Sequence, residues 1–404
     1  MMLRKIKTRF LILLVSLFLI PFHSLQAWGA GLEIEFEKVA GSSGTDRGTA
    51  ALQTVDGGYV VVGETMSSYL HGHSKYDAYL LKLDAKGLLK WQKTYGGGSD
   101  DRALSIKQTK DDGFILTGVT QSFNQSLDKN VYLVKTDASG QKKWYRTYGG
   151  SGDDSGTWVE QTSDGGYIIV GETTSSGAGD KDIYLIKTND QGQLMWEQTL
   201  GGKGSDSGVS VLATKDGGYL LVGQTNSTGA GSFDIYLAKV DGKGKKEWAK
   251  TLGGSGLDCV NSLKETTDGG YIIAGESSTY NPTGSDAYLL KIDNAGNLQW
   301  EKTYGGNGWA VGKSVQQVPE GGYLLAGWTT AKDRRGFDLY LVKTDEAGKK
   351  LWDKTLARDK FDPSFSIQQT NNGIIITGWC IEKMKWTQNR NDDVEVYFMK
   401  LKLQ

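Results

Sequence analysis

The chain has 404 residues, of which 56 are glycine and only 4 are proline, and its formal net charge is −1. This glycine share is about twice the usual one and implies many tight turns. The balanced charge excludes the strongly basic character of a typical nucleic-acid-binding protein, and two cysteines exclude a disulfide scaffold.

The first 27 residues are predicted to be a secretory signal peptide. They carry Arg4, Lys5, Lys7 and Arg9 and no acidic residue, and the apolar run FLILLVSLFLIPF follows. A basic start, an apolar centre and a small, polar end are typical of such peptides, and we expect cleavage after Ala27. The apolar run is short for a membrane span, although an uncleaved anchor is the alternative. Removal of the peptide leaves 42 basic and 47 acidic residues, a net charge of −5. We therefore expect an exported protein (periplasm, cell surface or extracellular) with no membrane span after cleavage.

The remaining chain is a repeat with a period of about 52 residues. Six tryptophans mark the period at spacings of 53 and then 52 residues: Trp91, Trp144, Trp196, Trp248, Trp300 and Trp352. Each unit holds four β-rich runs, which in the third unit are residues 156–162, 167–173, 182–188 and 194–200. The second and third runs are almost continuously apolar, as in strands buried on both faces, and SDGG and NDQG between runs are hairpin signals. Four antiparallel strands in about 50 residues predict a β-propeller blade.

The two ends of the chain are predicted to close the ring together. Seven first strands can be counted, from residues 48–54 to residues 364–370. The last unit ends after its third strand, EVYFMKLKLQ, whereas the N-terminal segment LEIEFEKVAG supplies a spare strand with Phe36 at the tryptophan position. We predict an all-β, seven-bladed propeller over residues 32–404, with four antiparallel strands per blade. The N-terminal strand completes the last blade, which removes the exposed edges of an open array.

Two known propeller families resemble this repeat. SGVSVLATKDGGYLLVGQT followed by DIYLAKVDGKGKKEW resembles the kelch order of strands and turns, and LDAKGLLKW is similar to the docking motif of quinoprotein-type (PQQ-like) repeats. The kelch double glycine is single here, and the quinoprotein threonine is missing. Both resemblances imply a propeller whose first strand is innermost and whose fourth is outermost. Neither brings a cofactor constellation with it, so we expect no cofactor.

A glycine- and aspartate-rich loop precedes each first strand. GGSGDDSG at residues 149–156 fits the start of the calcium-binding β-roll repeat, but that repeat needs copies in tandem, and here the copies are about 52 residues apart. The last aspartate of the loop recurs in six units: Asp46, Asp101, Asp154, Asp206, Asp258 and Asp362. These aspartates are expected to accept hydrogen bonds from loop amides. The alternative is an acidic ring at the channel mouth that binds a cation or a polar ligand.

A specific binding site is expected where the repeats break their own pattern. The residue after the glycine of the second strand is Glu, Val or Gln in the first five units and becomes Trp328 and Trp379 in the last two. The candidate binding residues are Trp309, Trp328, Arg334, Arg335, Trp379, Lys383, Lys385 and Trp386. Indole faces stack on sugar rings and cations, and guanidinium groups bind carboxylates and phosphates. The alternative is that these residues only fill loops of unequal length.

No catalytic motif of the G-x-S-x-G, H-E-x-x-H, P-loop or paired-cysteine zinc type occurs. We therefore expect no metal site and a non-enzymatic, monomeric protein that binds a glycan or a cell-envelope partner, with no nucleic-acid partner. Two alternatives remain open: a glycoside hydrolase or lyase that uses the channel-mouth aspartates, and a structural surface protein. Cys259 and Cys380 fall in non-neighbouring blades, too far apart for a disulfide, so two free thiols are expected.

Overall fold

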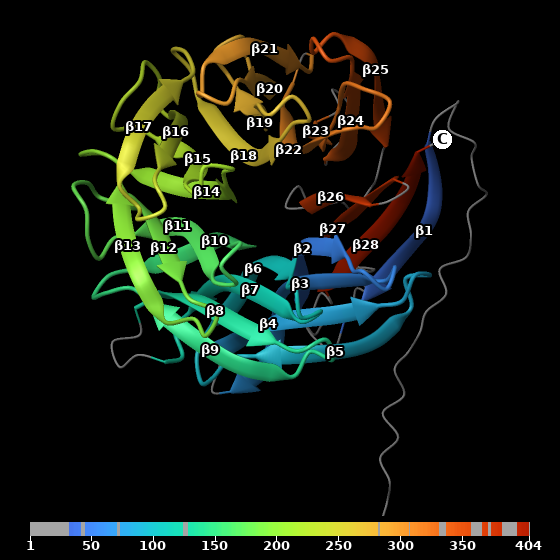
Figure 1. The fold of residues 1–404 in the computed structure, drawn as a ribbon. Helices are drawn as coiled ribbons and strands as arrows, with labels where there is room; N and C mark the ends of the chain where they lie inside the picture. The colour runs from blue at the N-terminus through green and yellow to red at the C-terminus, as the bar shows by residue number, and fades with distance from the viewer. Residues whose placement is uncertain are drawn as a thin grey trace, which may run out of the picture.

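The protein is a ring of seven four-stranded sheets (Figure 1). The computed structural model describes residues 32–41, 45–70, 73–123, 128–281, 283–306, 308–330, 337–356, 366–370, 373–381 and 394–403. All secondary structure in these residues is β-strand, so the predicted seven-bladed propeller is confirmed. The predicted signal peptide, residues 1–27, lies outside the described residues.

In the first six blades the four strands run outward from the central axis in chain order, and in the seventh blade the N-terminal strand is the outermost (Figure 1). The first, innermost strands are β2 (Asp46–Gln53), β6 (Asp101–Gln108), β10 (Asp154–Gln161), β14 (Asp206–Ala213), β18 (Asp258–Glu265), β22 (Ala310–Gln317) and β26 (Ser366–Thr370). The second strands are β3 (Tyr59–Leu70), β7 (Phe114–Thr120), β11 (Tyr167–Thr173), β15 (Tyr219–Thr225), β19 (Tyr271–Ser277), β23 (Tyr323–Thr329) and β27 (Gly373–Ile381). The third strands are β4 (His73–Leu83), β8 (Asn130–Thr136), β12 (Asp182–Thr188), β16 (Asp234–Val240), β20 (Asp286–Ile292), β24 (Asp338–Thr344) and β28 (Val394–Leu403). The outermost strands are β5 (Leu89–Tyr95), β9 (Lys142–Tyr148), β13 (Leu194–Leu200), β17 (Lys246–Leu252), β21 (Leu298–Tyr304), β25 (Lys350–Leu356) and β1 (Leu32–Ala40).

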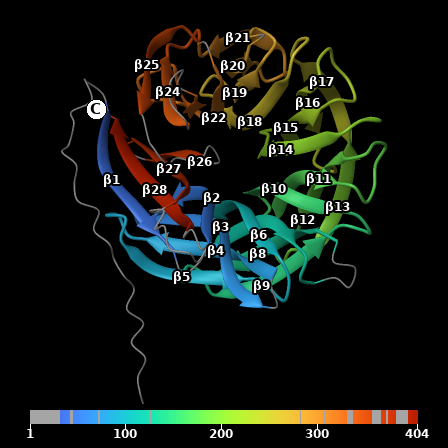
Figure 2. The same ribbon diagram turned by 180° about the vertical axis from the view of Figure 1, so that it is seen from behind.

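The seventh blade joins the two ends of the chain, as predicted. Its strand order is β1-β28-β27-β26, and Figure 2 shows β1 alongside β28. The Phe36 ring lies 5.7 Å from both the Phe398 and the Tyr59 rings. A Cβ at Gly87 would lie 2.7 Å from Phe36, just as one at Gly140 would lie 2.6 Å from Trp91. Phe36 therefore occupies the tryptophan position of the seventh blade.

Each outer-strand tryptophan packs against the following blade. Trp144 meets Tyr167 edge to face with ring centroids 5.9 Å apart, and Trp196 meets Tyr219 at the same distance. Gly192, at φ 69°, lets the turn of the next blade lie on the Trp144 ring, because a Cβ there would be 2.7 Å from it. Apolar side chains fill the space between neighbouring blades, and burying each Val, Leu or Ile contributes about 1.5–3 kcal/mol. These contacts join the blades into one body.

Near the axis, a β-bulge in each of the first six innermost strands brings blades into direct contact. In β10 the bulge lies between Gly156 and Trp158, and the Thr157 hydroxyl donates to the Gly208 carbonyl of the next blade at 2.7 Å. A Cβ at Gly171 would lie 1.8 Å from the Ser155 carbonyl oxygen, so this strand pairing requires glycine. These six strands begin two residues earlier than predicted, because the loop aspartate, or Ala310 in the sixth blade, already pairs with the second strand.

Candidate functional site

The long loops lie on one face of the ring, which we call the loop face. In the third to sixth blades, the backbone at the start of the innermost strand bonds to the loop between the second and third strands of the preceding blade. The N–H of Asp154 donates to the Lys129 carbonyl at 2.8 Å, and the N–H of Asp206 donates to the Lys181 carbonyl at 2.7 Å. Ala310 makes the same bond to Ser285 at 2.7 Å. The backbone link between blades therefore forms with or without an aspartate side chain.

The recurring aspartates lie inside these loops. Asp46, Asp101, Asp154, Asp206 and Asp258 are each exposed by 1 % or less. One carboxylate oxygen of Asp206 accepts the Gly202 N–H at 2.9 Å and the Ser227 hydroxyl at 2.6 Å. Asp154 and Asp258 make equivalent bonds to their own loops. This geometry is that of a loop brace, and it does not place these five carboxylates at an open channel mouth. Asp362 lies outside the described residues.

Burial affects the ionisation of one of these carboxyls. Burial raises the pKa of Asp101 above its ordinary value, although bonds from Ser122, Thr120 and the Gly97 N–H oppose the rise. A buried carboxylate that is held by several donors suits a fixed structural contact better than exchange of ligands with solvent.

In the first and third blades, the glutamate after the second-strand glycine bridges two blades. Glu64, with a side chain exposed by 7 %, binds Arg47 of its own blade at 2.9 Å and Arg102 of the next at 2.8 Å. Glu172 accepts bonds from Lys181 at 3.0 Å and from the Ser207 hydroxyl of the next blade at 2.8 Å.

The sixth blade replaces this bridge with aromatic side chains. Trp328 pairs with Val311, two residues beyond Trp309, so both tryptophans lie at the loop end of one strand pair. Trp309 is 48 % exposed. Trp328 is half-buried, and its ring meets that of Phe337 edge to face with centroids 4.8 Å apart. The Trp328 indole N–H is buried and has no hydrogen-bond partner in the described part of the chain. The structure therefore places two of the predicted binding residues at the same end of one strand pair.

The other predicted binding residues cannot be placed. Trp379 belongs to β27, where its backbone pairs with Val396, but its side chain is not described. Five further residues lie outside the described residues: Arg334, Arg335, Lys383, Lys385 and Trp386. Between the first and second blades, the Arg47 and Arg102 guanidinium groups lie 5.9 and 5.6 Å from the centroid of the Tyr76 ring, which adds basic and aromatic groups to the same face.

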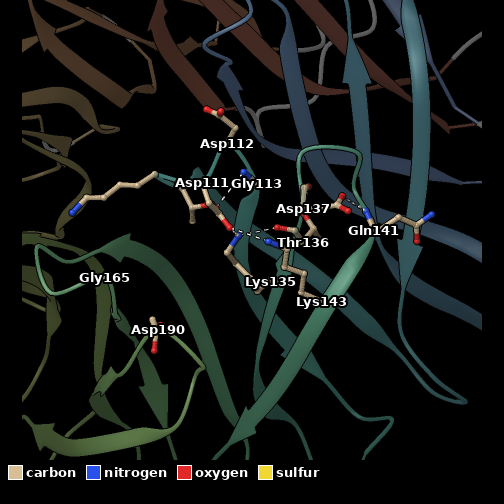
Figure 3. A network of polar contacts seen from close by, with 12 residues as sticks. Asp111, Asp112, Gly113, Lys135, Thr136, Asp137, Gln141, Lys143, Gly165 and Asp190 are labelled. Carbon is tan, nitrogen blue, oxygen red and sulfur yellow. Dashed lines mark hydrogen bonds and ion pairs between the residues drawn. The ribbon is translucent and has the colours of Figure 1, made fainter.

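Sequence reasoning missed a second recurring network, on the opposite face, which carries the short turns and which we call the turn face. A lysine of the third strand reaches the aspartate of the first turn: Lys135 lies 2.9 Å from Asp111, and Lys187 lies 2.8 Å from Asp164. Figure 3 shows Asp111 between Lys135 and Lys143. These lysines lie within apolar runs such as YLVKT, which drew attention away from them. A lysine recurs at this position in the third strand of each blade, so the sequence does carry the signal.

The ion pairs of the turn face are reflected in the pKa values of the aspartates. Burial by itself raises the pKa of Asp164, but hydrogen bonds from Lys187 and Thr162 outweigh it and lower the pKa to about 2. The pKa of Asp268 is lowered to about 2, first by the Thr266 hydroxyl bond and despite burial, with Lys291 adding to the effect. The network is structural, because it repeats around the ring.

Within the described residues, no group of three or more His, Cys, Asp or Glu side chains could hold a metal ion, and no helix is long and apolar enough to cross a membrane. Cys259 is a buried free thiol, and burial, followed by repulsion from Glu276, raises its pKa to about 12. The side chain of Cys380 is not described, so the expected pair of free thiols stays a prediction.

No family model and no curated protein matches the chain, but solved propellers do. The WD40 domain of Pan2 from Neurospora crassa is 10% identical, with a TM-score of 0.54 over 92% of this chain and 95% of that one. A puromycin hydrolase mutant complexed with PGG is 14% identical, with a TM-score of 0.53 over 84% of this chain and 50% of that one. Sqt1 from Chaetomium thermophilum is 12% identical, with a TM-score of 0.49 over 87% of this chain and 85% of that one. The first two similarities show the propeller fold alone.

Proposed function

We propose that this protein is an exported, non-enzymatic binding protein that holds a glycan of the cell envelope on its loop face, at the sixth and seventh blades. The observation that carries the proposal is the pair Trp309 and Trp328. One presents an exposed indole face, and the other a buried indole N–H that has no partner among the described residues. Sugar rings combine apolar faces, which stack on indole, with hydroxyl groups, which accept such a hydrogen bond.

Two further points support a binding role over catalysis by the recurring aspartates. The five described aspartates are buried, and four of them, Asp101, Asp154, Asp206 and Asp258, are bonded to loop groups, whereas glycoside hydrolysis needs two carboxyl groups that reach the scissile bond. The aromatic pair also departs from the repeat, as a specific site does. A relationship to kelch-type or quinoprotein-type propellers remains part of the proposal, and it brings no cofactor.

Glycan arrays followed by calorimetry on the best ligand test this function. Trp309→Ala should weaken binding about tenfold, since an aromatic contact contributes about 0.5–1.5 kcal/mol beyond its area. Trp328→Phe keeps an aromatic ring but removes the N–H donor, and it should weaken binding while the melting temperature stays close to that of the parent.

Tyr280→Ala is the matched control. Tyr280 is a 56 % exposed aromatic residue on the loop face of the fifth blade, outside the proposed site, and its loss should leave affinity unchanged. The proposal is wrong if Trp309→Ala and Trp328→Phe both bind the glycan as tightly as the parent does.

A further inference from the structure

The innermost strands present two rings of equivalent positions near the axis, defined by strand register. The first ring is Ala50, Ser105, Trp158, Ser210, Ser262, Ser314 and Ser366. The second ring, two residues closer to the turn face, is Leu52, Lys107, Glu160, Leu212, Lys264, Gln316 and Gln368. Trp158 is the one large residue among small ones, so the repeat breaks its pattern here as well.

Side chains from three blades converge on Trp158. The Lys107 ammonium lies 4.4 Å from the centroid of its ring, and the Lys264 ammonium lies 5.3 Å from it. These lysines come from the second and fifth blades, whereas Trp158 and Glu160 belong to the third. We call these four residues the axial cluster.

The axial cluster carries more positive charge than its one carboxylate balances. Glu160 lies 2.6 Å from Lys107, and the same oxygen accepts the Trp158 N–H at 3.1 Å. Within the described residues, Lys264 forms no ion pair. Elsewhere in the two rings, the Ser210 hydroxyl and the Gln316 side-chain N–H₂ are buried and have no hydrogen-bond partner in the described part of the chain.

We propose that the axial cluster binds one small oxyanion, a phosphate or a carboxylate, against Lys264 with help from Lys107. An ammonium group beside an indole is stabilised by the ring but not neutralised, and an oxyanion supplies the missing charge and acceptors through charge-assisted bonds. This site lies toward the turn face and is separate from the proposed glycan site on the loop face.

The ionisation of Lys264 agrees with this geometry. Burial, followed by repulsion from Lys107, lowers its pKa to about 8, while Glu160 opposes the shift. Because only the protonated amine attracts an anion, affinity should fall as the pH rises through about 8.

Calorimetric titration of the full chain with inorganic phosphate, and separately with acetate, tests the proposal. Ionic strength is held constant with sodium chloride, because bulk screening alone changes electrostatic contacts. The parent should bind at least one of the two anions, and the comparison distinguishes phosphate from carboxylate. Lys264→Gln should weaken that binding about tenfold, as expected for one lost charge-assisted bond, whereas Lys264→Arg should retain it.

Lys215→Gln is the matched control, since Lys215 is a lysine on the turn face with an 84 % exposed side chain, and it should bind like the parent. Trp158→Phe tests the site without changing either lysine. Anion binding should change the tryptophan fluorescence of the parent, and this change should disappear in the variant. The proposal is overturned if neither anion gives heat or a fluorescence change with the parent, or if Lys264→Gln and Lys215→Gln bind equally.

Discussion

At the scale of single residues, the buried carboxylate of Asp206 holds its loop through the Gly202 N–H and the Ser227 hydroxyl. Asp206→Asn keeps the shape of the side chain but removes the charge. We expect a loss of about 1–3 kcal/mol in the free energy of unfolding, the usual contribution of hydrogen bonds to a charged group. Chemical denaturation measures this loss.

The control for this substitution is Asp190→Asn, which changes an exposed aspartate of an outer turn and should alter stability little. Glycan affinity should be unchanged in both variants. A parent-like stability of Asp206→Asn would contradict the role of loop brace.

At the scale of elements, the turn-face ion pairs predict acid sensitivity. The pKa values of Asp56 and Asp164 fall from 3.8 to about 2 on folding, because bonds from Lys82 and Lys187 outweigh burial. A lowered folded-state pKa stabilises the protein above the unfolded pKa, and this stabilisation is lost as the pH falls from about 4 to about 2. The melting temperature should therefore drop over that window.

Asp164→Asn should reduce this acid dependence and lower stability at neutral pH by about 0–1 kcal/mol, since the aspartate of the pair is half exposed. Calorimetric scans from pH 6 to pH 2, run on the variant and the parent together, measure both effects. Identical pH profiles of variant and parent would show that the Lys187–Asp164 pair contributes nothing to the loss of stability in acid.

At the scale of the whole molecule, the ring depends on the strand that closes it. Deletion of residues 32–39 removes most of β1 and leaves β28 with an unpaired edge. We expect aggregation or a large fall in melting temperature, because open sheet edges pair with other chains. Light scattering and calorimetry record these outcomes, and a synthetic peptide of residues 32–40 should reverse them in part. A truncated protein that melts like the parent would mean that the ring closes in another way.

The period and the apolar runs predicted the fold well, since strand pairing within a blade is local in sequence. In the third blade the predicted bounds of β11, β12 and β13 match the structure. The start of β10 at Asp154, which pairs with Thr173 of β11, was missed because the glycine- and aspartate-rich sequence before Gly156 is typical of a loop. The axial cluster could not be predicted, since Lys107, Trp158 and Lys264 meet only after three blades are arranged around the axis.

The pairing of Leu32 with Leu403 has a consequence for the time course of folding. Hairpins of neighbouring strands form within about 1–10 μs, and six blades are built from such local pairs. The seventh blade cannot be completed until the two ends of the chain meet. Bringing them together costs conformational entropy, because the loop between them is very long, until the other blades hold the ends close to each other. We therefore expect joining of β1 to β28 to be the slowest step of assembly, and the backbone amides of this sheet to exchange with solvent sooner than those of the blades opposite.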